Sequence, residues 1–282
     1  MSSRSIYDHV QAPDLQTRIA SYFRPGSLIF IGIYFFLDTL IKSPFLFLTD
    51  FGKFRHKAFA KLWAGYGQAM SEEMPGGTVE LVATASGVVL DIGPGTGTQL
   101  HLFTPSKIKT IYAAEPAIDM HAELKRAADS NLLGDKYKIL AAGAEPQSLI
   151  PALAKDGLLD ISSQGGEDVF DTIVSLRALC GVPSQEETAA CLYRLLKPGG
   201  RLLLCEHVQQ TWPNGGDVFG AIMQRIYMLA GWSFWLGGCC LDRDTEGILR
   251  KVAGPDGWKE VKINRLQPYA AIPYIVGEMV KA

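Results

Sequence analysis

The chain has 282 residues, of which 48% are hydrophobic and 20% charged, and its formal net charge is −2. These values are typical of a globular protein with a substantial core, and they exclude a disordered chain, a collagen-like repeat and a small disulfide scaffold. The five cysteines include no CxxC pair, so they predict neither a disulfide framework nor a structural zinc site, and they favour a reducing compartment.

The N-terminal part differs in character from the rest. Residues 1–61 hold eight basic and four acidic residues, a net charge of +4, which leaves −6 for the remainder. After a polar, weakly helical lead-in over 1–23, the stretch 28–51 is mostly apolar, but Asp38 and Lys42 interrupt it. Charge near the middle of a membrane span costs a few kcal/mol, so a clean spanning helix is not expected.

A basic and aromatic run follows the apolar stretch, with Lys53, Arg55, His56, Lys57 and Lys61 interleaved with aromatic residues. This pattern is typical of an interfacial helix that meets anionic lipid head groups. The sequence therefore predicts a monotopic membrane attachment, within an N-terminal segment of residues 1–65. The alternative is a helical cap that forms a substrate lid on the main domain, and one segment can serve both purposes.

From residue 78 onward, strands alternate with helix-length segments such as 116–129 and 185–196. This alternation predicts an α/β fold over residues 66–282, a doubly wound, mostly parallel seven-stranded sheet with helices on both faces, preceded by the N-terminal helical apolar appendage. The expected strands are Val88–Ile92, Thr110–Ala114, Tyr137–Ala141, Val169–Ser175, Arg201–Glu206, Glu260–Asn264 and Ile272–Val280.

A glycine-rich turn follows the first expected strand in the segment VVLDIGPGTG at 88–97. Glycine is needed where a turn demands positive φ or where backbone closely approaches a ligand. The third glycine comes one residue earlier than in a dinucleotide fingerprint, and an acid precedes the first. Glu115 ends the next strand, where a carboxylate can accept both hydroxyl hydrogens of a ribose. The D-x-G-x-G-x-G pattern resembles motif I of the class I S-adenosylmethionine-dependent methyltransferases.

That resemblance implies S-adenosyl-L-methionine as cofactor and assigns roles by position. The acid of the motif meets the ammonium of the cofactor, often through water, the glycines leave backbone open, and Glu115 binds the ribose. Adenine contacts follow the third strand, with the backbone amide of Ala144 preferred to the side chain of Glu145. The implied cofactor-binding residues are Asp91, Gly93, Gly95, Gly97, Glu115, Ala144 and Glu145.

The C-terminal part narrows the resemblance. ALCGV at 178–182, CEHV at 205–208, GGCCLDRDT at 237–245 and the closing PYIVGEMVKA are similar to the methyltransferase-like seven group, which are membrane-associated alkyl thiol S-methyltransferases. A lipophilic acceptor follows from this likeness, most plausibly a thiol, as does a place at the cytosolic face of the endoplasmic reticulum or on lipid droplets. The chain departs from the group at Asp91 and Pro94 and in a longer insertion around 147–168.

Few catalytic groups are required, because the sulfonium methyl is already activated and the enzyme mainly aligns a nucleophile and excludes water. A thiol with a pKa near 8.5 costs roughly 2 kcal/mol to ionise at pH 7, so a strong base is needed only for an alcohol. His207 is the expected acid/base or acceptor-orienting group, and Glu206 is expected to position the neighbouring loop. Cys180, Trp232 and Trp235 are expected to line the acceptor pocket, and no metal site is expected.

The apolar stretch 212–236 is either core, an acceptor pocket or a second membrane surface. Two other functions stay open: an O- or C-methyltransferase of a hydrophobic polyketide, sterol or quinone, and a membrane-attached binding protein without turnover. Nucleic acid is not an expected partner, because the catalytic part is acidic and has no basic stripe.

Overall fold

The computed structural model describes residues 13–72, 74–159, 168–255 and 257–282. Its centre is a seven-stranded sheet with the order β3-β2-β1-β4-β5-β7-β6, parallel except for β7, which runs antiparallel to both neighbours. The expected fold class is thereby confirmed, and each expected strand forms. The strands are β1 (Gly87–Ile92), β2 (Ile108–Ala114), β3 (Tyr137–Leu140), β4 (Phe170–Leu176), β5 (Leu196–His207), β6 (Trp258–Leu266) and β7 (Tyr274–Lys281).

Helices cover both faces of this sheet and also its edge at the strand ends. They are α1 (Leu15–Phe23), α2 (Gly26–Lys42), α3 (Pro44–Thr49), α4 (Phe51–Glu72), α5 (Thr78–Val82), α6 (His121–Ser130), α7 (Pro146–Lys155), α8 (Gln185–Leu195), α9 (Val218–Leu229), α10 (Trp232–Trp235) and α11 (Thr245–Val252), with short 3₁₀ turns at Leu100–Leu102, Pro105–Lys107, Ile118–Met120 and Gly134–Lys136. The insertion expected around 147–168 contains most of α7, and its residues 160–167 lie outside the described residues.

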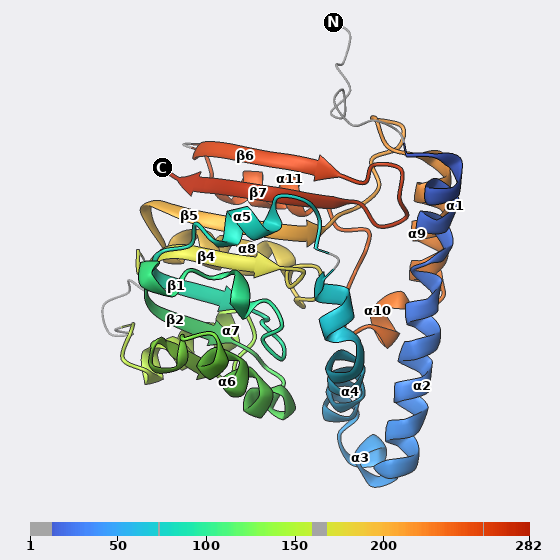
Figure 1. The fold of residues 1–282 in the computed structure, drawn as a ribbon, viewed down its shortest axis with the longest axis horizontal. Helices are drawn as coiled ribbons and strands as arrows, with labels where there is room; N and C mark the ends of the chain where they lie inside the picture. Colours follow the sequence, from blue (N-terminus) through green and yellow to red (C-terminus); the bar gives the residue numbers. More distant parts are fainter. Residues whose placement is uncertain (1–12, 73, 160–167, 256) are drawn as a thin grey trace, which may run out of the picture.

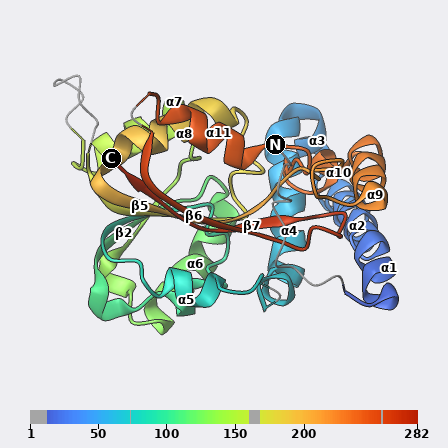
Figure 2. The same cartoon turned by 90° about the horizontal axis from the view of Figure 1, so that it is seen from above.

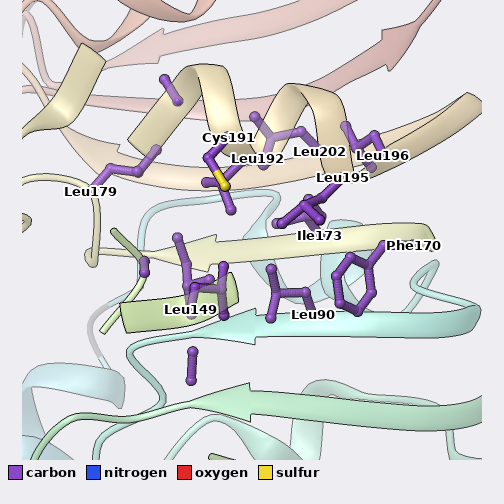
Figure 3. Packing of buried hydrophobic residues seen from close by; sticks show 14 of the residues in the cluster. Leu90, Leu149, Phe170, Ile173, Leu179, Cys191, Leu192, Leu195, Leu196 and Leu202 are labelled. Carbon is purple, nitrogen blue, oxygen red and sulfur yellow. The ribbon is translucent and has the colours of Figure 1, made fainter. Parts of the chain in front are cut away.

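Two apolar cores lie on opposite faces of the sheet. Helices α7, α8 and α11 cover one face, and α5 and α6 cover the other (Figure 2). In the first core, Leu90 and Ile173 of the sheet meet Leu149 of α7 and Leu195 of α8, all with no more than 1% of their surface exposed (Figure 3). Because these parallel strands are buried on both sides, their sequences read as near-continuous apolar runs.

A helical layer stands at the carboxyl ends of the parallel strands and consists of α1–α4, α9 and α10 (Figure 1). Within it α2 packs against α4 and α10, and α1 packs against α9. Leu62, Tyr227 and Trp232 belong to a third apolar cluster that joins the layer. In an open α/β sheet ligands bind outside the carboxyl ends of the strands, so the layer covers the place where a ligand is expected.

Three basic side chains of α4 contact its neighbours, whereas Lys53 and His56 of the same run are exposed. Arg55 donates hydrogen bonds to the carbonyl oxygens of Ser233 and Phe234, and Lys57 donates to the hydroxyl of Ser43. Lys61 pairs with Asp38 of α2 at 2.9 Å. Arg55, Lys57 and Lys61 thus hold α4 against its neighbours rather than projecting toward lipid head groups.

Many large apolar side chains of this helical layer are exposed on its outer surface. By length and composition alone, Leu15–Lys42 could cross a membrane: an 18-residue window within it has a mean hydropathy of 1.4, and 17% of that window is buried. The segment 212–236 forms α9 and α10, separated by Gly231 at φ +83°. Large exposed apolar side chains of the layer are Leu15, Ile19, Phe23, Phe30, Tyr34, Leu37, Ile41, Phe45, Leu48, Phe51, Tyr66, Val218, Phe219, Ile222, Ile226, Leu229 and Phe234.

Candidate active site

The turn after β1 has the backbone conformation that its glycines permit. Gly93, Gly95 and Gly97 have φ of +63°, +62° and +81°, in the left-handed region. A Cβ atom at Gly95 would lie 2.5 Å from Nε1 of Trp63, and one at Gly93 would lie 3.0 Å from the Cβ of Ala178. Helix α4 and the loop after β4 therefore both close on this turn.

Asp91 is a buried acid near the end of β1, with 5% of its surface exposed. The Tyr137 hydroxyl donates a 2.9 Å hydrogen bond to it, and no basic side chain of the described residues pairs with it. Burial raises the pKa of Asp91 to about 7, although the Tyr137 hydrogen bond opposes the shift. A carboxyl group in this environment is suited to a cationic ligand that compensates for its lost hydration.

Glu115 lies directly beside the same turn, one residue after β2. Its Oε2 accepts the Gly95 N–H at 2.9 Å and its Oε1 accepts the Ala117 N–H at 2.8 Å. Burial raises the pKa of Glu115, and these two hydrogen bonds partly offset the rise. Since each carboxylate oxygen has two lone pairs, the fixed group can accept two further hydroxyl hydrogens, as a vicinal diol requires.

The residues expected to contact adenine follow β3, at the same carboxyl end of the sheet. Ala144 is 7% exposed, and Glu145 is half-buried and precedes the first residue of α7. The Glu145 carboxylate folds back over Gly143, whose N–H donates to the Ser148 hydroxyl at 2.9 Å. The strand ends thus bring all the predicted cofactor residues to one edge.

Glu206 holds the loop after β4. Its carboxylate is fully buried and accepts hydrogen bonds from the Ser175 hydroxyl and from the backbone N–H groups of Ala178, Leu179 and Cys180. These contacts confirm the interpretation that Glu206 positions the neighbouring loop. They also fix where Cys180 stands relative to β5.

His207 ends β5 beside two cysteines. Its Nδ1 lies 3.5 Å from Sγ of Cys239, and its Nε2 lies 3.0 Å from the hydroxyl of Tyr274. The two cysteine sulfurs and a ring nitrogen of His207 all lie within 4.8 Å of one another. The hydrogen bond from the Cys180 thiol, and secondarily the neighbouring His207, hold the pKa of Cys239 well below its ordinary value. The hydrogen bond to Cys239, together with burial, raises the pKa of Cys180. Backbone pairing of Cys240 N–H with the Cys180 carbonyl, at 2.8 Å, brings the two loops together.

The two tryptophans expected in the acceptor pocket have different surroundings. Trp232 is 2% exposed and lies in the apolar cluster that borders Cys239. Trp235 instead packs on α2, against Gly32 and the ring of Phe36, whose centroid is 5.4 Å away. Trp232 is thus placed beside the cysteines, and Trp235 supports the N-terminal helix.

The sequence predicted no role at the site for three residues near it: Trp63, Arg177 and Tyr274. Arg177 has φ of +60°, and its Nη1 donates to the Met70 carbonyl at 2.7 Å. Its Nε and Nη2 are buried without a hydrogen-bond partner, and so is Nε1 of Trp63. Because each of these residues acts through partners far away in the chain, no local pattern marks it. Unpartnered buried donors of this kind call for an explanation such as an absent ligand.

Comparisons with known proteins bear on this site as a whole. A family model described as methyltransferase domain matches residues 54–242. Human thiol S-methyltransferase TMT1B is 27% identical over 203 residues, which cover 70% of this chain and 72% of the relative. An O-methyltransferase family protein from Burkholderia thailandensis has a similar structure, with a TM-score of 0.54 and 15% identity over 90% of this chain and 71% of that one. Geranyl diphosphate methyltransferase in complex with S-adenosylmethionine gives 0.51 and 10%, over 82% and 91%.

Proposed function

We propose that this chain, which belongs to the methyltransferase domain family, methylates the sulfur of a lipophilic thiol at a membrane surface. It is an S-adenosylmethionine-dependent methyltransferase, as motif I predicts, and the interpretation as a binding protein without turnover is not supported. The acceptor and the place of reaction are the proposal. The observation that carries it is the apolar cluster that packs against Cys239 near the end of β5, in a layer of helices with exposed apolar side chains.

The residues at the strand ends fit S-adenosylmethionine. Asp91, a buried acid without a cationic partner, suits the ammonium of the cofactor, and Glu115 has lone pairs free for both ribose hydroxyls. The unpartnered Nε and Nη2 of Arg177 suit the carboxylate of the methionyl part, since the next residue, Ala178, lies against Gly93 of the turn. When bound, the cofactor supplies an electrophilic methyl group on a sulfonium.

The contribution of the chain to the reaction is to align the acceptor and exclude water. Helix α4 serves as the cover: Trp63 lies over Gly95, the Ser71 and Thr98 hydroxyls share a 2.6 Å hydrogen bond, and Arg177 holds the end of the helix. We therefore propose that α4 acts as a substrate lid. His207, fixed through both ring nitrogens, would orient the acceptor beside the methyl group.

The membrane surface is supported by the apolar side chains on the outside of the same layer. Ile41, Phe45 and Leu48, on α2 and α3, are 80%, 80% and 78% exposed. Contiguous exposed apolar patches on soluble monomers are rarely larger than a few hundred Å², and larger ones mark interaction surfaces. Because α2 packs along α4, we propose that the layer lies on the bilayer rather than crossing it, with the acceptor entering from the lipid.

The function is tested with the purified full-length chain and the labelled cofactor. Turnover is measured as S-adenosylhomocysteine formed with 1-hexanethiol and thiophenol, and with 1-hexanol and phenol as oxygen analogues of the same shape. We expect turnover with the thiols alone, because only a thiol ionises near neutral pH without a strong base. Cofactor binding by calorimetry without any product from the thiols would contradict the proposal.

A second candidate, methylation of an oxygen of a hydrophobic metabolite, is favoured by the place of His207 at a strand end. There an imidazole can act as general base. The change His207→Ala separates the two: loss of turnover with phenol, in a chain that keeps its thiol turnover, would support oxygen methylation. Loss of thiol turnover would instead support the first proposal.

A further inference from the structure

Three side chains of metal-ligand type, Cys180, His207 and Cys239, meet at the end of the sheet although they come from three separate segments. We propose that they bind a zinc-type divalent cation and leave one coordination position for the sulfur of the acceptor. The inference rests on the proposed thiol methylation and goes beyond it, since the sequence predicts no metal site.

The distances suit tetrahedral coordination. Bonds of about 2.3 Å to sulfur and about 2.05 Å to nitrogen put a sulfur and a nitrogen ligand roughly 3.5 Å apart and two sulfurs roughly 3.8 Å apart. The sulfur of Cys239 is 3.5 Å from Nδ1 of His207, and none of the three ligand atoms is more than 4.8 Å from another. A cation therefore needs side-chain shifts on the order of 1 Å and no backbone change.

The surroundings orient these side chains as a second shell does. Metal-bound histidines almost always donate their other ring N–H to a polar partner, and Nε2 of His207 lies 3.0 Å from the Tyr274 hydroxyl. Nδ1, which among the described residues contacts only the sulfur of Cys239, can therefore turn its lone pair to a cation shared with that sulfur. The buried indole N–H of Trp232, which has no hydrogen-bond partner, belongs to the cluster that borders Cys239 and suits a metal-bound thiolate.

The number and charge of the ligands indicate an open site. Two thiolates neutralise a divalent cation, and among the described residues no fourth cysteine, histidine or carboxylate joins the three. The neighbouring Cys240 donates its thiol to the Gly238 carbonyl, and Glu206 is occupied by the Cys180 loop. Structural zinc sites are closed by four protein ligands, whereas catalytic sites have three and keep one position for a small molecule.

The open position is close to the cofactor residues and to an apolar wall. Cys180 lies two residues after Ala178. The Cβ of Ala178 lies 3.0 Å from the place that a Cβ on Gly93 of the turn would take. Cys239 packs against the third apolar cluster, which includes Leu62 and Trp232 and suits an alkyl chain. An acceptor bound through sulfur would thus place its chain among apolar groups and its reacting atom near the methyl group.

The chemistry balances without a further reactant. The acceptor thiol loses its proton to solvent as its sulfur binds the cation, because a metal-bound thiol is deprotonated outright. A sulfur lone pair forms the new bond to the methyl carbon, and the sulfonium carbon–sulfur bond breaks, leaving its electron pair on S-adenosylhomocysteine. The neutral thioether product is a weaker ligand than a thiolate, which favours its release.

The cation site is tested directly with cobalt(II) as a spectroscopic probe and Zn²⁺ as competitor, on the metal-free full-length chain kept reduced with a phosphine. We expect one equivalent to bind, with thiolate-to-cobalt charge-transfer absorption that Zn²⁺ abolishes. Cys239→Ser and His207→Ala should weaken binding at least a hundredfold, and Tyr274→Phe on the order of tenfold. The matched control Cys240→Ser should bind as the parent chain does.

The open position is tested by adding 1-hexanethiol to the cobalt-loaded chain, with hexyl methyl sulfide as control. New charge-transfer absorption with the thiol alone supports the inference. No stoichiometric cobalt binding by the reduced chain, binding that survives in both ligand variants, or a Cys180–Cys239 disulfide in place of metal binding would each overturn it. Calorimetry of cofactor binding and thiol turnover on the same samples reports separately on the proposed function, which stands if turnover occurs without metal.

Discussion

The change Glu115→Gln is the sharpest test of the cofactor site. It preserves the shape and removes the charge and half of the acceptors. Because the Glu115 carboxylate accepts one N–H from Gly95 and one from Ala117, the amide nitrogen of a glutamine must face one of these donors. The remaining carbonyl oxygen can then serve only one side of a ribose diol.

The magnitude follows from these contacts. A hydrogen bond to a charged group contributes about 1.5–3 kcal/mol, so losing one ribose contact should raise the cofactor Kd roughly ten- to a hundredfold. One buried backbone N–H is also left without a partner, which should lower the free energy of unfolding by about 1–3 kcal/mol. Both effects are expected at once, since the same carboxylate supports the turn and binds the ligand.

Calorimetric titration with S-adenosylmethionine and urea unfolding measure the two effects separately. The matched control is Glu80→Gln on α5, an exposed glutamate of the first helical turn that should change neither quantity by a measurable amount. A Kd within threefold of the parent value, in a Glu115→Gln chain of unchanged fold, would refute the assignment of the ribose to Glu115.

Three further predictions concern the turn, its acid and the helical layer. Because burial raises the pKa of Asp91 from 3.8 to about 7, the free energy of unfolding should fall as the pH rises from about 4 to 7. Urea unfolding at several pH values should show that Asp91→Asn removes this pH dependence. An unchanged pH dependence in the variant would contradict the pKa shift. Gly95→Ala puts a Cβ 2.5 Å from Nε1 of Trp63 at a residue with positive φ. We therefore expect about 1–3 kcal/mol of destabilisation in a thermal scan and weaker cofactor binding in calorimetry. An unaltered melting temperature would contradict the close packing. Replacing Ile41, Phe45 and Leu48 together by glutamate removes little buried surface, so the fold should persist. Flotation with anionic vesicles should fall roughly a hundredfold, because the apolar surface that meets the lipid is lost. Equal flotation of the triple variant and of a Val79→Glu control would exclude the membrane surface.

The sequence by itself determined the sheet and the residues of the turn. Alternating strands and helices predict the parallel sheet, because each element buries an apolar face with its own period. The resemblance of the D-x-G-x-G-x-G pattern to motif I predicts the cofactor, and the carboxyl ends of parallel strands bring Asp91, the three glycines and Glu115 together. These signals are local, so they are readable along the chain.

Only the tertiary structure decided what surrounds that edge. The inward-facing Arg55 and Lys61, the indole of Trp63 over Gly95, and the meeting of His207 with Cys239 depend on how α4 and the loops pack at the strand ends. Such contacts join residues far apart in the chain. They depend on how the elements pack, so no periodicity or motif spacing in the sequence predicts them. The contacts among the expected acceptor residues His207, Cys180 and Trp232 therefore became visible only in three dimensions, whereas the cofactor residues could be predicted from their order in the chain.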